Sequence, residues 1–185
     1  MKKIRIYFNA PITLSFVCIC IFALILDNLT NGTSTKYVFS TYNSSWLNPL
    51  TYIRLVCHVF GHKDLSHLIS NSLYLLLLGP ILEEKYHKKV IYVILITAIV
   101  TGLCHNLIEP NTALLGSSGI VFAFILMASI TGKANGIPIT LLLVAALWLG
   151  QEIYTGIINN DSISHLSHII GGLSGAMLGM VYKKK

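Results

Sequence analysis

Six long apolar runs constrain the fold of this chain more than any other feature. A helix needs about 20 apolar residues to cross the hydrocarbon core of a bilayer. Only 11% of the 185 residues are charged, against about 25% in soluble domains. The runs cover residues 11–26, 65–82, 90–108, 117–131, 137–158 and 163–182. The sequence therefore predicts an all-α membrane protein, residues 1–185, with six transmembrane helices in one domain.

The basic residues predict the orientation of the helices. With six spans, ten of the thirteen Lys and Arg residues fall on one side. Short basic clusters beside spans mark the cytoplasmic side, so both termini are predicted to be cytoplasmic. The net charge of +6 is explained by this topology, and no nucleic-acid partner is expected. The cytoplasmic cluster is Lys2, Lys3, Arg5, Lys85, Lys88, Lys89, Lys133 and residues 183–185.

Two further features limit the alternatives. The first run resembles a signal peptide but lacks a small-x-small cleavage site, so we expect a retained helix. It is followed by a long first loop, residues 27–64, which is polar and turn-rich and then carries Trp46 and Tyr52, residues suited to a membrane interface. The four cysteines show no paired spacing, which indicates neither a disulfide framework nor a metal knuckle.

Polar side chains recur at one depth of the predicted bundle. His67 and Asn71 lie four residues apart, on one face of the second run. Ser118 opens the fourth run, and His165 and His168 lie near the start of the sixth. At 1.5 Å per residue, all fall within roughly 10 Å of the outer surface. Strongly polar groups inside spans are costly and usually functional, so this level is the candidate site.

The residue types predict acyl-transfer chemistry. A serine hydroxyl needs an adjacent base to become a nucleophile, and His168 is the candidate base for Ser118. His67, Asn71 and the Ser118 backbone N–H are candidate donors to an oxyanion. No acidic residue lies near this level in the second, fourth or sixth run. The prediction is a Ser–His dyad, with Phe122 on the Ser118 face available to orient the histidine.

Small residues predict close contact between the fourth and sixth runs. Gly119 and Ala123 are four residues apart, and Gly171, Gly175 and Gly179 repeat every fourth residue. Such spacing lets two helices approach closely. Close approach could bring Ser118 and His168 within hydrogen-bond reach, about 3 Å.

These motifs, spread from about Arg54 to Gly179, resemble those of the rhomboid intramembrane serine proteases. The nucleophile motif is matched by Gly116-x-Ser118-Gly119, the catalytic-histidine helix by His168-x-x-Gly171-x-x-x-Gly175, and the oxyanion pair by His67-x-x-x-Asn71. Lesser matches are His58 and His62 before the second helix, Gly79-x-x-x-Glu83 at its end, and Arg54 of a first-loop Trp-Arg pair. Two positions depart from the family pattern: Ile53 replaces the Trp of that pair, and Phe122 replaces a Tyr that commonly stacks on the histidine.

The resemblance implies a function as well as a fold. It implies a six-helix bundle with a site open to water from the outer side, a first loop partly embedded in the membrane, and a fifth span that acts as a lateral gate. Substrates would be single-span membrane proteins, cut near the outer end of the span after a small residue. No metal and no cofactor is implied. Small size and the absence of a targeting tail favour a bacterial inner membrane.

Two rival functions are distinguished by simple features. A catalytically inactive relative would bind membrane segments without cutting them, and the intact dyad argues against it. A small transporter would place polar residues near the bilayer midplane with broken helices, whereas here they cluster near one surface.

Several other polar residues are expected to have no catalytic role, or an undecided one. Ser117 is adjacent to Ser118 but would point about 100° away on a helix, so Ser118 is the predicted nucleophile. His165 is expected to be a more exposed, interfacial histidine without a catalytic role, and His105 is also expected to be interfacial. Glu152 is either a near-surface residue or a polar contact at the gate.

The first loop contains the remaining polar groups of interest. His58, His62 and His67 could suggest zinc, but their spacing places His67 off the face shared by the other two, and no further ligand follows. We therefore expect structural hydrogen-bonding roles and no metal. Arg54 is expected to anchor the first loop to headgroups or backbone carbonyls.

Overall fold

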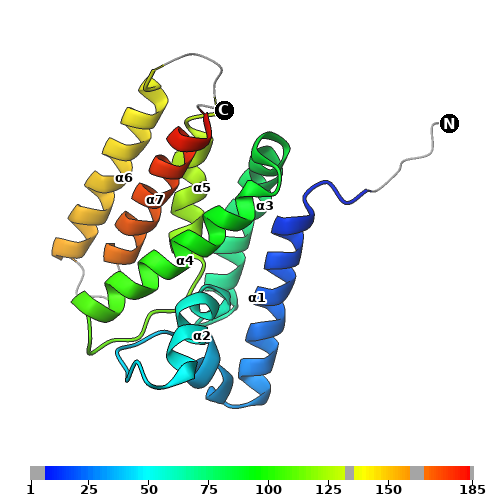
Figure 1. Ribbon diagram of the computed structural model, residues 1–185, viewed down its shortest axis with the longest axis vertical. Coiled ribbons are helices and arrows are strands. Elements are labelled where there is room, and N and C mark those ends of the chain that lie inside the picture. The colour runs from blue at the N-terminus through cyan, green and yellow to red at the C-terminus, as the bar shows by residue number, and fades with distance from the viewer. Residues whose placement is uncertain (1–6, 132–135, 159–164, 184–185) are drawn as a thin grey trace.

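The chain forms a helical bundle in the computed structural model, which describes residues 7–131, 136–158 and 165–183 (Figure 1). Within these ranges the only extended pairing is an isolated antiparallel bridge between Thr41 and Leu114, so the all-α prediction is confirmed. The helices are α1 (Pro11–Leu29), α2 (Pro49–Cys57), α3 (Leu65–Tyr86), α4 (Lys89–Ile108), α5 (Ser118–Ala128), α6 (Ile139–Ile158) and α7 (His165–Lys183), with a π-helix at Thr35–Phe39 and a 3₁₀ turn at His58–Phe60.

Each of the six predicted runs contains a helix, with ends shifted by a few residues. The largest shift is at α3, which continues through Glu83 and Glu84 to Tyr86; α1, which ends at Leu29, and α5, which ends at Ala128, are each shifted by less. Among the described helices, α1, α3 and α4 are long and apolar enough to cross a membrane. The six-span count and the cytoplasmic termini stay predictions, and Lys2, Lys3, Arg5, Lys133, Lys184 and Lys185 of the basic cluster lie outside the described residues.

The first loop is folded rather than a simple polar connection, and helix α2 within it was not predicted. Pro49 fits the first helical position, and the side chain of Asn48 caps the helix by accepting from Leu50 N at 3.0 Å. Helix α2 packs against α4 and buries Thr51, Arg54 and Leu55. This helix was not predicted because its nine residues are too few to give a membrane-length apolar signal.

Helix α5 is the centre of the bundle. In Figure 1 it lies between α3 and α7, with α1 and α6 at the two edges, and it packs on α3, α4 and α7. A helix that is apolar on all sides belongs in a core, and seven of its eleven residues are buried. The residue that begins this helix is Ser118, so the candidate nucleophile starts the most enclosed element.

The close contact of α5 and α7 is confirmed. A Cβ atom added at Gly171 would collide with the backbone of Gly119, and one added at Gly175 would collide with the backbone of Ala123. The two helices therefore touch backbone to backbone, as the repeated small residues predicted.

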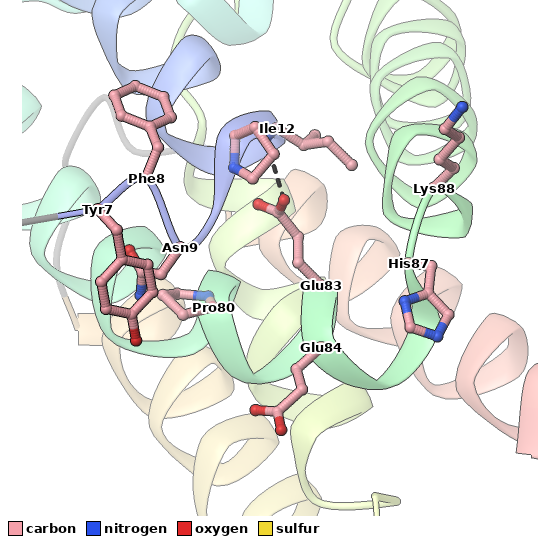
Figure 2. Close-up of a pocket in the computed structure, with 10 residues that line it drawn as sticks. Tyr7, Phe8, Asn9, Ile12, Pro80, Glu83, Glu84, His87 and Lys88 are labelled. Atoms are coloured by element: carbon pink, nitrogen blue, oxygen red, sulfur yellow. Dashed lines mark hydrogen bonds between the residues drawn. The ribbon is translucent and has the colours of Figure 1, made fainter.

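Helices α1 and α3 are joined by a buried carboxylate. Glu83 accepts from Ile12 N at 3.0 Å and from Thr13 N at 2.7 Å. The contact with Ile12 is drawn in Figure 2. The N-cap residue of α1, Ala10, has no side chain that can cap the helix, so Glu83 satisfies N–H groups that a helix start leaves unpaired. Four residues earlier, Gly79 lies directly against Thr13. The Gly79-x-x-x-Glu83 motif thus has a packing role.

Candidate active site

Ser118 and His168 meet where α5 and α7 begin. Ser118 Oγ lies 2.9 Å from His168 Nε2. Both side chains are half-buried. Gly116, two residues before the serine, has φ +123°, a left-handed conformation that favours glycine. This turn delivers the chain into α5 with Ser118 at the first helical position.

The neighbouring serine has a different environment. Ser117 is fully buried, with 0% exposure, and its hydroxyl lies 3.2 Å from His62 Nε2. Two Ser–His pairs therefore lie one residue apart, but only the Ser118 pair is partly open. Burial thus favours Ser118 over Ser117 as a group that can reach a substrate.

Two aromatic rings pack in sequence behind His168. The Phe122 ring centroid lies 4.7 Å from that of His168, at an interplanar angle of 45°. Phe122 also stacks on Trp148 of α6, with centroids 4.9 Å apart. The sequence analysis placed Phe122 beside the histidine but missed Trp148, because a tryptophan inside an apolar run carries no distinguishing signal.

His67 lies on α3 beside the Gly116 turn, and Asn71 lies four residues further along the same helix. A Cβ atom added at Gly116 would lie 2.9 Å from His67 Cε1 and 3.9 Å from Ser118 Oγ, so the imidazole ring, the turn and the serine are neighbours. Asn71 is buried, and its Nδ2 has no hydrogen-bond partner among the described residues. A buried donor without a partner is unusual and is available to a ligand.

The first loop holds the segment that precedes Ser118. Thr41 and Leu114 exchange two backbone hydrogen bonds, of 2.9 and 2.8 Å. Gly116 N donates to the carbonyl of His58 at 3.0 Å. Together with the contact from His62 to Ser117, these bonds fix the turn from the loop side. The sequence analysis did not anticipate this link.

The predicted hydrogen-bonding roles of His58 and His62 are present. His58 Nδ1 lies 3.2 Å from the Arg54 carbonyl, and its Nε2 lies 3.5 Å from Thr101 Oγ1. Burial disfavours the imidazolium form and lowers the pKa of His58 and of His62 from 6.5 to about 4. Both rings are therefore neutral near pH 7.

One argument about these histidines was wrong. The spacing placed His67 away from the other two, whereas the rings of His62 and His67 are 5.0 Å apart. Helical spacing does not apply here, because His62 lies in the loop before α3. Within the described ranges no group of three or more His, Cys, Asp or Glu side chains has the arrangement of a metal site.

Arg54 was predicted to anchor the first loop to headgroups or backbone carbonyls, but its side-chain hydrogen bonds in the described part of the chain go to hydroxyl groups. Its side chain is buried, its Nη2 donates to Ser44 Oγ at 2.6 Å and to Thr51 Oγ1 at 3.2 Å, and its guanidinium lies over the ring of Tyr42. The partners are hydroxyl groups and an aromatic ring of the same loop. Arg54 therefore stabilises the first loop from within.

Three other polar residues had been given predictions. His105 is buried rather than interfacial, with Nδ1 3.4 Å from Glu109 Oε2. His165 is half-buried, as His168 is, and its ring lies 6.3 Å from the His168 ring; its greater exposure stays a prediction. The side chain of Glu152 lies outside the described residues.

A cavity of about 600 Å³ lies at the opposite end of α3 from His67 (Figure 2). Among the described residues that line it there is no serine, threonine or cysteine, and the Glu83 carboxylate within it is engaged by α1. This cavity therefore has no serine–histidine pair like the one at the other end, although His87 is part of its lining. Its lining residues are Tyr7, Phe8, Asn9, Pro11, Ile12, Pro80, Glu83, Glu84, His87 and Lys88.

Comparison with known proteins gives a consistent family. The family profile described as Rhomboid domain matches residues 49–185, from α2 onward. The chain is 32% identical over 139 residues to Rhomboid-related protein 1 of Caenorhabditis elegans, and the aligned region covers 69% of this chain and 39% of that protein. It is 27% identical over 175 residues to Rhomboid protease GlpG of Yersinia pestis, and the aligned region covers 91% of this chain and 61% of that protein. The chain thus spans less than two thirds of the length of these relatives.

Proposed function

The chain belongs to the rhomboid family, and on that premise we propose that it is a serine endopeptidase that cleaves membrane-protein segments within the bilayer. The observation that carries the proposal is the 2.9 Å contact between Ser118 Oγ and His168 Nε2. A hydroxyl in hydrogen-bond contact with an imidazole is the arrangement needed for an activated nucleophile.

The proposed reaction follows from these two groups. Ser118 Oγ attacks the scissile carbonyl while His168 Nε2 takes its proton, and the imidazolium then protonates the leaving amine. A water molecule next attacks the acyl-enzyme, gives its proton to Nε2 and releases Ser118. No carboxylate is required to orient the base, because Phe122 and Trp148 pack one behind the other on the His168 ring.

The negative oxygen formed in each step is stabilised from α5 and α3. The first N–H groups of a helix have no intrahelical partner and carry the positive end of its dipole, and Ser118 is the first residue of α5. The unpartnered Nδ2 of Asn71 and the imidazole of His67 are the proposed side-chain donors. Both lie on α3, four residues apart, and His67 lies beside the Gly116 turn.

The proposed membrane arrangement is a single domain, residues 1–185, with six spans and both termini in the cytoplasm. The site then lies just below the outer surface, where water reaches it, and the lipid bilayer surrounds the bundle. The proposed substrates are single-span membrane proteins, cut near the outer end of the span after a small residue. The proposed location is a bacterial inner membrane, and no metal or cofactor takes part.

A cleavage assay in liposomes tests the proposal. The purified chain is reconstituted with a single-span protein whose outer end contains small residues, and products are followed by gel and mass spectrometry. Cleavage by the wild type, and its loss in Ser118→Ala and His168→Ala, is expected. Ser129→Ala is the matched control that should cleave normally, because Ser129 caps the far end of α5 and its hydroxyl donates to the Leu126 carbonyl. Full activity of Ser118→Ala would refute the nucleophile, and substrate binding without cleavage by the wild type would identify an inactive relative.

A further inference from the structure

Ser117 occupies the N-cap position of α5, but its hydroxyl does not cap the helix. A serine at this position usually accepts a hydrogen bond from the second or third N–H of the helix. Ser117 makes no such bond among the described residues, and its backbone has φ −84° and ψ 5° rather than extended values. Its hydroxyl lies instead 3.2 Å from His62 Nε2.

The direction of this hydrogen bond follows from the other nitrogen of the ring. His62 Nδ1 lies 3.1 Å from the carbonyl oxygen of Phe60, and a carbonyl only accepts. Nδ1 therefore carries the proton, and Nε2 is left with a lone pair. Ser117 must then donate its hydroxyl proton to His62 Nε2.

The loop fixes the position of His62. A Cβ atom at Gly61 would collide with the backbone carbonyl of Phe39, so these two segments of the first loop are in direct backbone contact. The carbonyl of His58, four residues earlier, binds Gly116 N. His62 is buried, with 2% exposure. Its acceptor nitrogen is thus held at a defined place beside the turn.

We propose that His62 is a positioning residue that holds the Ser117 hydroxyl away from the N-terminus of α5, so that the N–H groups there stay available to the reaction. The inference rests on the proposed function. A buried hydroxyl needs a partner, and without His62 the nearest alternatives for an N-cap serine are the N–H groups of Gly119 and Ile120. The serine oxygen would then add partial negative charge where the oxyanion of the reaction forms, and would weaken its stabilisation.

The proposal makes an asymmetric prediction for the two partners. Loss of His62 frees the hydroxyl to cap the helix and slows catalysis. Loss of the Ser117 hydroxyl removes the competing group and leaves catalysis intact, although the buried His62 then lacks its partner and stability falls. Loss of both should restore catalysis. A merely structural hydrogen bond predicts no such rescue.

The experiment compares His62→Leu, Ser117→Ala, the double variant and His62→Gln, which keeps an acceptor. In detergent, a fluorophosphonate probe reacts with the full-length chain as Ser118 Oγ displaces fluoride from phosphorus, and the labelling rate is measured. His62→Leu should label about 10-fold more slowly, a smaller loss than deletion of a whole oxyanion donor. The double variant, Ser117→Ala and His62→Gln should label at rates close to the wild type. With a cleavable substrate, the loss in His62→Leu should appear in kcat and not in KM.

Each contrary result has a distinct meaning. A double variant that is labelled as slowly as His62→Leu would overturn the inference. So would a His62→Leu variant that is labelled at the wild-type rate, or a Ser117→Ala variant that is labelled slowly. In all three cases the wild type is labelled and cleaves substrate, so the proposed function stands. A wild type that is neither labelled nor active would overturn the proposed function together with this inference.

Discussion

Ser118 Oγ lies 2.9 Å from His168 Nε2, although the two residues are 50 positions apart in the chain. The contact exists because α5 and α7 approach backbone to backbone at Gly119 and Gly171. Any larger residue at these positions separates the helices that carry the two groups. The geometry of the proposed dyad therefore depends on residues that take no part in the chemistry.

This dependence predicts the effect of Gly171→Ala. The new methyl group would collide with the backbone of Gly119, which cannot rotate away as a side chain can. We expect loss of most cleavage activity, and a loss of stability of about 1–3 kcal/mol, as for overpacked cores. Activity and thermal unfolding in detergent measure both effects. Gly150→Ala is the control, because nothing lies within 4 Å of a Cβ at that glycine, and an equal loss there would contradict the packing argument.

Asn71→Ala tests the proposed oxyanion donor. Because Asn71 Nδ2 is buried and has no partner among the described residues, its removal should not lower the thermal unfolding midpoint. Removal of one oxyanion donor typically costs about 10²–10³-fold in kcat, and we expect a loss of this size with little change in KM. Steady-state kinetics on a membrane substrate provide the measurement. An unchanged kcat would contradict the oxyanion role, and an unchanged kcat together with a lower unfolding midpoint would assign Asn71 a packing role.

Glu83→Ala tests the link between α1 and α3. The carboxylate accepts from two backbone N–H groups of α1, so its loss should lower the free energy of unfolding by about 1–2 kcal/mol, as loss of a helix cap does. The remaining folded protein should cleave normally, since Glu83 lies at the far end of α3 from His67. Glu84→Ala is the control, because Glu84 is exposed. Equal midpoints for the two variants in thermal unfolding would show that the cap contributes nothing.

The two buried loop histidines predict that acid destabilises the fold. Their pKa is about 4 in the folded protein against 6.5 as the ordinary value. Between pH 6.5 and 4 the unfolded chain therefore binds protons that the folded chain does not, so stability is full above pH 6.5 and falls as the pH drops. One pKa unit corresponds to about 1.4 kcal/mol, so protonation of the unfolded chain at each histidine lowers the free energy of unfolding by up to about 3 kcal/mol at acid pH.

His62→Gln removes one of these two proton-binding sites and should flatten the pH dependence. Unfolding midpoints in detergent between pH 7.5 and pH 4.5 measure the slope, on the wild type and the variant in parallel. Parallel curves for the two proteins would mean that His62 is protonated as easily in the folded state as in the unfolded state.

Much of the helical architecture could be predicted, because apolar runs and small-residue spacing are local signals. The runs located six helices, and Gly119, Ala123, Gly171 and Gly175 predicted the contact of α5 with α7. Polar groups at one depth predicted which residues would be near one another. Ser118 and His168 are in contact as expected, and Phe122 lies beside the histidine.

The sequence was less informative where the chain is polar or irregular. Helix α2 is too short to give a membrane-length apolar run. The burial of Arg54 depends on Ser44, Thr51 and Tyr42, whose approach has no periodic signal. The contacts of His62 were missed because helical spacing was applied to a residue in a loop. Each of these features depends on tertiary folding of the first loop.

Identification of the serine that reacts with a fluorophosphonate probe tests the central claim most directly. The full-length protein is labelled in detergent, digested, and sequenced by fragmentation mass spectrometry, which separates adjacent serines. The account predicts one adduct, on Ser118, that disappears in Ser118→Ala and in His168→Ala. An adduct on Ser117 or on any other residue, or undiminished labelling of Ser118 without His168, would contradict it.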